Sequence, residues 1–181
     1  MVDSLPSSQV KQATLRNYAK QYNLRVFIET GTNTGDTVEQ LRQDFDQVYS
    51  IELGRDLYEK AREKFRNVSN VELIHGDSAI ELEKLLSRIN QPALFWLDGH
   101  YSGGETARGS GDTPIREELQ HIFSSKDLGH VVIIDDARDF SGTCSSYPTV
   151  EEVSNLIRLK RPDVDIVVDD DSIRITPKGK S

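Results

Sequence analysis

Residues 26–37 read VFIETGTNTGDT and join a short apolar run to a turn of small residues. The apolar run has the β-branched and aromatic composition of a strand, and Gly31 and Gly35 would let the backbone of the turn approach a ligand closely. The residues that follow can start a helix, and exposed amides at a helix start can receive a carboxylate or phosphate. The same pattern is also found in structural turns and in dinucleotide sites, so this stretch alone leaves the ligand open.

The order of strand and then helix repeats along the chain. Apolar runs without alternation near positions 93–97 and 131–134 are typical of central strands that are covered on both faces. The later segments 165–168 and 172–176 flank acidic turn residues and indicate a terminal antiparallel hairpin. We therefore predict an α/β fold, a Rossmann-like, mostly parallel sheet of seven strands with helices on both faces and a C-terminal antiparallel hairpin. Besides the two strands of the hairpin, the predicted strands are 25–30, 47–52, 71–76, 93–98 and 130–136, of which the last two contain the apolar runs named above. The predicted helices are 7–21, 37–45, 55–67, 79–89, 114–124 and 150–160.

The chain has 181 residues, a length common for one domain. We expect one domain over residues 1–181, with a leading helical segment at 1–24 and a core at 25–181. The single cysteine, Cys144, excludes an intrachain disulfide, and no apolar run reaches the ~20 residues that span a bilayer. Because the first residues also lack the basic and then apolar order of a signal peptide, we expect a cytoplasmic protein with no membrane contact.

The charge of the chain bears on its partners. A formal net charge of -8 would repel a phosphate backbone, so we expect no nucleic-acid partner. Basic residues stand at alternate positions from Lys60 to Arg66, but Glu59 and Glu63 interleave with them. We interpret this run as the solvated face of a helix rather than as a basic patch.

Acidic residues follow the next two predicted strands. Glu52 ends the second strand, where a carboxylate can bind ribose hydroxyls. Asp77 and Ser78 follow the third strand, where Asp77 could face an adenine ring or, as the alternative, cap the next helix. Acids at successive strand ends favour a nucleoside-containing ligand.

In these residues the chain resembles the class I methyltransferases that use S-adenosylmethionine (SAM), over residues 25–181. The resemblance implies that the glycine turn holds the methionine part of SAM, Glu52 the ribose, and Asp77 with Ser78 the adenine. Asn33 stands where the family usually has a middle glycine, and asparagine tolerates a left-handed backbone better than most residues. The cofactor-binding residues implied are Glu29, Thr30, Gly31, Thr32, Asn33, Gly35, Thr37, Glu52, Asp77, Ser78 and Asp98.

A Rossmann oxidoreductase that binds NAD is a competing interpretation, because it also uses a glycine turn and an acid after the second strand. Its G-x-G-x-x-G fingerprint would need a third glycine, whereas this turn has only Gly31 and Gly35. The terminal hairpin also favours the methyltransferase.

Three acids end the fourth and fifth predicted strands, which neighbour each other in a doubly wound sheet. Asp98, Asp135 and Asp136 should therefore converge, and a hard divalent cation such as Mg²⁺ would relieve their repulsion. This arrangement is similar to that of metal-dependent O-methyltransferases of the catechol and macrolide-sugar types, which implies Asp98, Asp135 and Asp136 as metal ligands. As the alternative, one or two of these acids cap loops or bind substrate.

The resemblance implies O-methylation of a small hydroxylated metabolite such as a sugar or polyol. With Asp98, His100 is our candidate catalytic residue, as the base that takes the hydroxyl proton, although a lone histidine in a polar loop could equally bind substrate or metal. Segment 102–112 is predicted to be a lid over the ligand, and Arg108 and Arg138 are candidates for binding an anionic part of the substrate. The alternative function is a SAM-binding accessory module without transfer activity. The two long loops and the leading helix should form the pocket, together with a second subunit if the protein is a homodimer.

Overall fold

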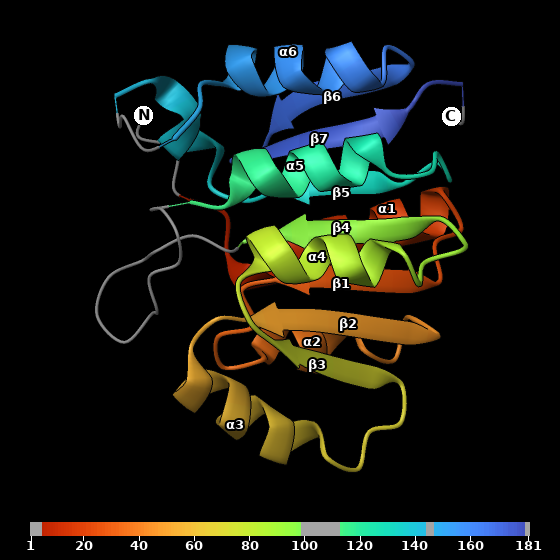
Figure 1. Ribbon diagram of the computed structural model, residues 1–181, viewed down its shortest axis with the longest axis vertical. Helices are drawn as coiled ribbons and strands as arrows, with labels where there is room; N and C mark the ends of the chain where they lie inside the picture. The colour runs from red at the N-terminus through yellow and green to blue at the C-terminus, as the bar shows by residue number, and fades with distance from the viewer. Residues whose placement is uncertain (1–4, 99–112, 144–146, 180–181) are drawn as a thin grey trace.

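The computed structural model describes residues 5–98, 113–143 and 147–179. Their seven strands form one sheet in the order β3-β2-β1-β4-β5-β7-β6, with β7 antiparallel to both of its neighbours and the other pairs parallel (Figure 1). The predicted fold class is confirmed. The strands are β1 Val26–Thr30, β2 Gln47–Glu52, β3 Val71–His75, β4 Ala93–Leu97, β5 Val131–Ile134, β6 Val164–Asp169 and β7 Ser172–Pro177.

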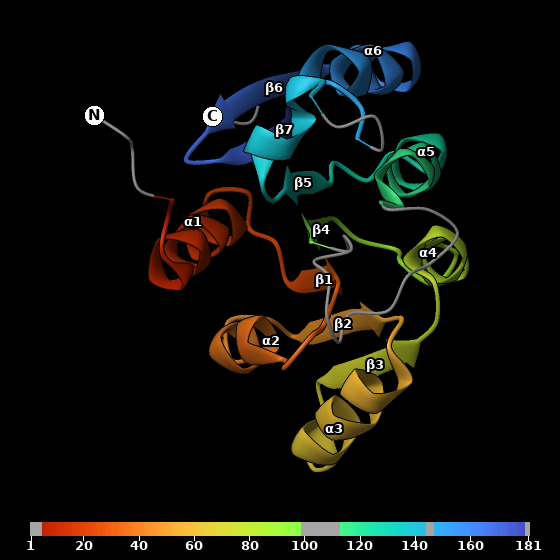
Figure 2. The same cartoon turned by 90° about the vertical axis from the view of Figure 1, so that its left-hand side faces the viewer.

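Helices cover both faces of the sheet. In Figure 2, α1 (Ser8–Gln21), α2 (Asp36–Leu41) and α3 (Arg55–Phe65) lie on one side, and α4 (Ser78–Leu86), α5 (Ile115–Ser124) and α6 (Val150–Lys160) lie on the other. Each face buries its own apolar core, so the central strands β1, β4 and β5 contribute residues to both.

The parallel register brings the carboxyl ends of the central strands level. Thr30 at the end of β1 pairs with Ile51 of β2 and Leu97 of β4, and Leu97 pairs with Ile134 of β5. The residues that follow these positions must therefore emerge at one edge of the sheet. That edge is where open α/β sheets bind their ligands.

Local chemistry explains where several helices begin. Thr149 caps α6, because its hydroxyl accepts from the backbone of Glu152 and the Glu152 carboxylate accepts from the backbone of Thr149. At α5 the prediction was wrong by one position: Pro114 is the cap and Ile115 the first helical residue, because the Pro114 backbone is not helical there. The amide of Ile115 still donates to the Thr113 hydroxyl, at 3.4 Å.

Several further bounds differ from those predicted. Helix α2 ends at Leu41 rather than near residue 45, because the chain turns at once so that Phe45 can pack into the core. A short 3₁₀ helix, η1 (Ala137–Ser141), follows β5. Among the described residues, no helix combines the length and apolar character needed to cross a membrane.

Candidate functional site

The glycine turn after β1 has the left-handed backbone that its sequence predicts. Gly31, Asn33 and Gly35 have φ angles of 88°, 50° and 70°. Asn33 thus occupies the conformation for which asparagine is suited. A Cβ atom on Gly35 would lie 2.8 Å from the Phe65 ring, so close packing against α3 also requires glycine here.

Glu29 lies beneath the turn. Its side chain is buried and accepts a hydrogen bond from the Ser50 hydroxyl at 2.6 Å, and the Ser50 and Thr32 hydroxyl oxygens are also 2.6 Å apart. Burial raises the pKa of Glu29 to about 8, against the opposing effect of the hydrogen bond from Ser50. The structure therefore places Glu29 as a support that ties β1, β2 and the turn together.

Glu52 holds the turn from the end of β2. One carboxylate oxygen accepts from the amide of Asn33 at 2.8 Å, and the other accepts from the amide of Gly54 at 2.7 Å. The residue is buried, yet each carboxylate oxygen can accept a further hydrogen bond from a ligand. Glu52 is thus fixed in position beside the turn.

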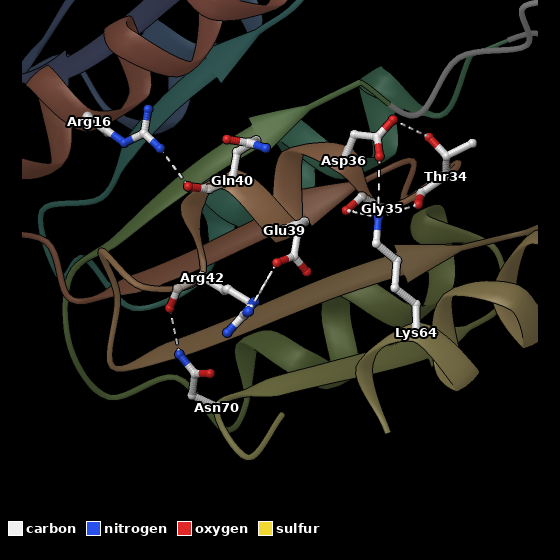
Figure 3. A network of polar contacts seen from close by, with 9 residues as sticks. All are labelled: Arg16, Thr34, Gly35, Asp36, Glu39, Gln40, Arg42, Lys64 and Asn70. Atoms are coloured by element: carbon white, nitrogen blue, oxygen red, sulfur yellow. Dashed lines mark hydrogen bonds and ion pairs between the residues drawn. The ribbon is translucent and has the colours of Figure 1, made fainter. Parts of the chain in front are cut away.

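Lys64 on α3 supports the turn from outside (Figure 3). Its ammonium donates to the carbonyls of Thr34 and Gly35 and to the carboxylate of Asp36, at 3.1 to 3.3 Å, while Thr34 bonds to the other oxygen of Asp36. The sequence interpretation assigned Lys64 to a solvated helix face. Lys64 is exposed, as that interpretation implies, but its contacts with the turn were not predicted, because the sequence does not show that α3 packs against the turn.

Asp77 and Ser78 lie at the start of α4. The Asp77 carboxylate accepts from the amide of Ala79 at 3.0 Å, so the capping alternative is realised in this structure. Ser78 is buried, and so are Thr30 and Thr32 at the glycine turn. Thr37 in α2 hydrogen-bonds to the Glu29 carboxylate. All of these predicted positions lie around the one sheet edge, as expected.

The three acids after β4 and β5 converge as predicted. Asp98, Asp135 and Asp136 each offer an oxygen within 4.8 Å of the others. Asp135 and Asp136 are buried and Asp98 is partly exposed. Burial raises the pKa of the Asp135 carboxyl. Such a cluster requires compensating positive charge.

Two side chains supply that charge. The Lys11 ammonium lies 2.5 Å from Asp135 and 3.6 Å from Asp136, and Arg138 lies 2.8 Å from Asp136. Lys11 was not predicted as a site residue. The spacing of residues in α1 could have indicated it, because Lys11 precedes Leu15 and Ala19 at intervals of four, and those two residues form the buried face of the helix.

Arg138 was proposed as an anion binder, but it is already paired. Its guanidinium contacts Asp136 and Asp171, and the Asp171 carboxylate also accepts from the Arg138 amide at 2.9 Å. The Asp171 carbonyl accepts from the amide of Ala137 at 2.8 Å. Thus the β6–β7 turn holds η1 in place. His100, Arg108, Cys144 and the predicted lid 102–112 lie outside the described residues.

A small hollow lies at the ends of β4 and β5, on the side of α5 and η1. Two of its lining residues are carboxylates, Glu118 and Asp135. Burial raises the pKa of Glu118 to about 7, with the hydroxyls of Ser78 and Thr30 opposing the shift. We call this space the β5 hollow; the rest of its lining is Leu97, Thr113, Ile115, Ile134, Phe140 and Tyr147.

Comparison with known proteins identifies the fold. No family model matches the sequence, and no curated protein matches it. The O-methyltransferase TomG of Streptomyces achromogenes, solved with SAM, is 19% identical over 97% of this chain and 82% of its own, with a TM-score of 0.66. An O-methyltransferase from Bacillus cereus, solved with S-adenosylhomocysteine (SAH), is 16% identical over 98% and 84%, with a TM-score of 0.69.

A third match broadens the comparison. The SAH-bound methyltransferase PaMTH1 of Podospora anserina is 14% identical over 96% of this chain and 80% of its own, with a TM-score of 0.64. The likeness lies in the backbone, since few residues are shared. This chain has the Rossmann-like fold of class I SAM-dependent methyltransferases.

Proposed function

We propose that this protein is a SAM-dependent O-methyltransferase that acts on a small hydroxylated molecule. One observation carries the proposal: the level ends of β1, β2 and β4 put Glu52 and Asp98 at the same sheet edge as the left-handed glycine turn. A nucleoside-containing ligand needs a close backbone approach and a carboxylate for its ribose, and this edge offers both.

The roles of the residues follow from their places. The turn at Gly31, Asn33 and Gly35 would receive the methionine part of SAM, with Glu29, Thr32 and Thr37 supporting it from below. Glu52 would accept the ribose hydroxyls while it keeps its bonds to the Asn33 and Gly54 amides. Asp77 and Ser78 would border the adenine. Asp98 would face the sulfonium.

The chemical step is a displacement. The acceptor oxygen forms a bond to the methyl carbon while the carbon–sulfur bond breaks, its electron pair stays on sulfur, and neutral SAH leaves. The hydroxyl proton must go to a base, and His100 remains our predicted base. Orientation of the hydroxyl in line with the carbon–sulfur bond is the main contribution that a protein makes to such a step.

The proposal also includes a divalent cation that assists the transfer. Asp98, Asp135 and Asp136 have the hard oxygen ligands that Mg²⁺ prefers, and they would hold it. The ion would lower the pKa of the acceptor hydroxyl when bound. The Lys11 ammonium, however, already contacts two of these acids, so a metal would bind only if Lys11 moved away. We therefore treat Lys11 and the metal as competing cations.

Calorimetry with SAM, SAH and NAD tests the cofactor, and transfer of a labelled methyl group to a panel of sugars, polyols and amino alcohols tests the reaction. We expect SAM and SAH to bind and NAD not to bind. Heat from NAD alone would overturn the proposal in favour of an oxidoreductase. SAM binding without transfer would favour the accessory module. Sedimentation in the same buffers tests whether the protein is the homodimer that we propose as an alternative way of completing its pocket.

A further inference from the structure

The β5 hollow is small and has both apolar and polar walls. Apolar side chains from β4, β5, α5 and η1 line it, and the rings of Phe140 and Tyr147 pack edge to face, with centroids 5.4 Å apart. The apolar part of these walls suits the hydrocarbon body of a small molecule.

Two carboxylates interrupt these apolar walls. Glu118 is 1% exposed and Asp135 is 5% exposed. Within the described part of the chain, no hydrogen bond of normal geometry reaches Glu118 Oε1 or Asp135 Oδ1, although the hydroxyls of Ser78 and Thr30 lie beside the Glu118 carboxylate. Leaving a buried acceptor unsatisfied is unfavourable by about 1–3 kcal/mol, so two of them beside one hollow indicate a ligand that supplies donors.

Asp135 is already oriented for such a ligand. Its Oδ2 atom is held by the Lys11 ammonium at 2.5 Å. Lys11 itself lines a different hollow, with Trp96 and Arg174, on the α1 side of the sheet. The second oxygen of Asp135, Oδ1, therefore remains available to the β5 hollow.

We propose that the β5 hollow binds a protonated amine of the methyl acceptor, through Glu118 and Asp135, so that the acceptor is an amino alcohol or amino sugar. This inference rests on the proposed methyltransferase function. An ammonium has three donors and a positive charge, so it satisfies both oxygens with charge-assisted hydrogen bonds. A neutral hydroxyl offers one donor and would leave its own lone pairs unsatisfied among apolar walls.

The protonation state also separates the anchor from the reacting group. A protonated amine has no lone pair with which to attack the methyl carbon, so it holds the acceptor without being methylated. A hydroxyl elsewhere on the same molecule keeps its lone pairs and is the nucleophile. Glu118 is thus a specificity-determining residue. It lies on the buried face of α5, together with Ile115 and Leu119.

The test compares benzylamine with benzyl alcohol, which have similar shapes and differ in charge. Calorimetry at neutral pH on the full chain saturated with SAH should give an affinity for the amine about ten-fold or more above that for the alcohol. Glu118→Gln should lower the amine affinity about ten-fold and leave the alcohol affinity unchanged. Glu117→Gln, at an exposed position on the same helix, is the matched control and should change neither.

Three results would overturn the inference. They are equal binding of the two probes by the wild-type protein, an amine preference that survives Glu118→Gln, and a preference lost equally in Glu117→Gln. If Glu118→Gln fails to fold, the wild-type comparison still decides. SAH binding is measured first, so a protein that binds SAH but does not prefer the amine keeps the proposed function and loses only this inference.

Discussion

The Lys11 ammonium and the Asp135 carboxylate meet at 2.5 Å although 124 positions separate them in the sequence. This pair joins the leading helix α1 to the end of β5, at the edge where the cofactor and acceptor would meet. Lys11 also lies 6.0 Å from the centre of the Trp96 ring, so its charge is held between an aromatic face and two acids. The leading helix is therefore part of the proposed site.

Lys11→Met should open the acidic cluster to metal. Without the ammonium, Asp135 and Asp136 lose the charge that compensates them, and the protein should become less stable in metal-free buffer. Mg²⁺ should then raise its melting temperature, with a much smaller effect on the wild type. Thermal melting with and without MgCl₂ measures both, and Lys20→Met, at an exposed position on the same helix, is the control. If the wild type and Lys11→Met respond equally to Mg²⁺, Lys11 and the metal do not compete.

Gly35→Ala should distort the glycine turn after β1. The residue has a φ of 70°, which strains any side chain, and the added Cβ would lie 2.8 Å from the Phe65 ring, so the ring or the backbone must shift. We expect lower stability and a loss of SAH affinity of about ten-fold or more. Gly179→Ala is the matched control, because its φ is 82° but nothing lies within 4 Å of the added atom. SAH affinity equal to wild type in Gly35→Ala would show that the turn does not contact the cofactor.

Glu52→Gln should weaken SAH binding while the fold persists. The amide keeps one oxygen but replaces the other with a donor, which faces the amide donor of Asn33 or that of Gly54. Charge-assisted hydrogen bonds are about twice as strong as neutral ones, so the affinity should fall by about ten-fold or more. Glu72→Gln, which removes only an exposed ion pair with Arg88, serves for comparison in the same calorimetric titration. Unchanged affinity in Glu52→Gln would remove the ribose assignment.

His130 should make the fold sensitive to acid. Burial lowers the pKa of His130 from its usual 6.5 to about 4, and its Nδ1 atom accepts from the Ala93 amide at 3.1 Å, which requires an unprotonated nitrogen. The unfolded chain takes up a proton near pH 6.5 and the folded chain only near pH 4. Stability should thus fall as the pH drops through this window, by up to about 3 kcal/mol.

Chemical denaturation at a series of pH values measures this slope. His130→Asn retains an acceptor for the Ala93 amide but does not titrate in this range, so its loss of stability between pH 6.5 and 4 should be shallower. His75→Asn, at an exposed position at the end of β3, should keep the wild-type slope. A slope in His130→Asn as steep as that of the wild type would contradict the assignment.

The fold could be predicted because its signals are local. Apolar runs such as 131–134, the glycine turn after β1 and the acidic hairpin turn each depend on neighbouring residues. The convergence of Asp98, Asp135 and Asp136 was also predictable, since parallel strands end at one edge and the acids follow directly. Sequence position and strand geometry suffice for such residues.

Lys11, Lys64 and Glu118 were not predicted because they depend on how helices pack. Each is a charged residue on a helix, and such residues are usually solvated. Glu118 follows Ile115 by three positions and precedes Ile122 by four, so it lies within the apolar stripe of α5. A charge within an apolar stripe is the signal that sequence reasoning could have used, for Glu118 as for Lys11.

The position of Asp171 in the β6–β7 turn has a consequence for biosynthesis. The residues that surround the glycine turn, from β1 to β4, leave the ribosome first, whereas β7 must later insert between β5 and β6. Only then can Asp171 fasten η1, and with it the Phe140 wall of the β5 hollow. We expect the nascent chain to complete the proposed SAM site before it completes the proposed acceptor site.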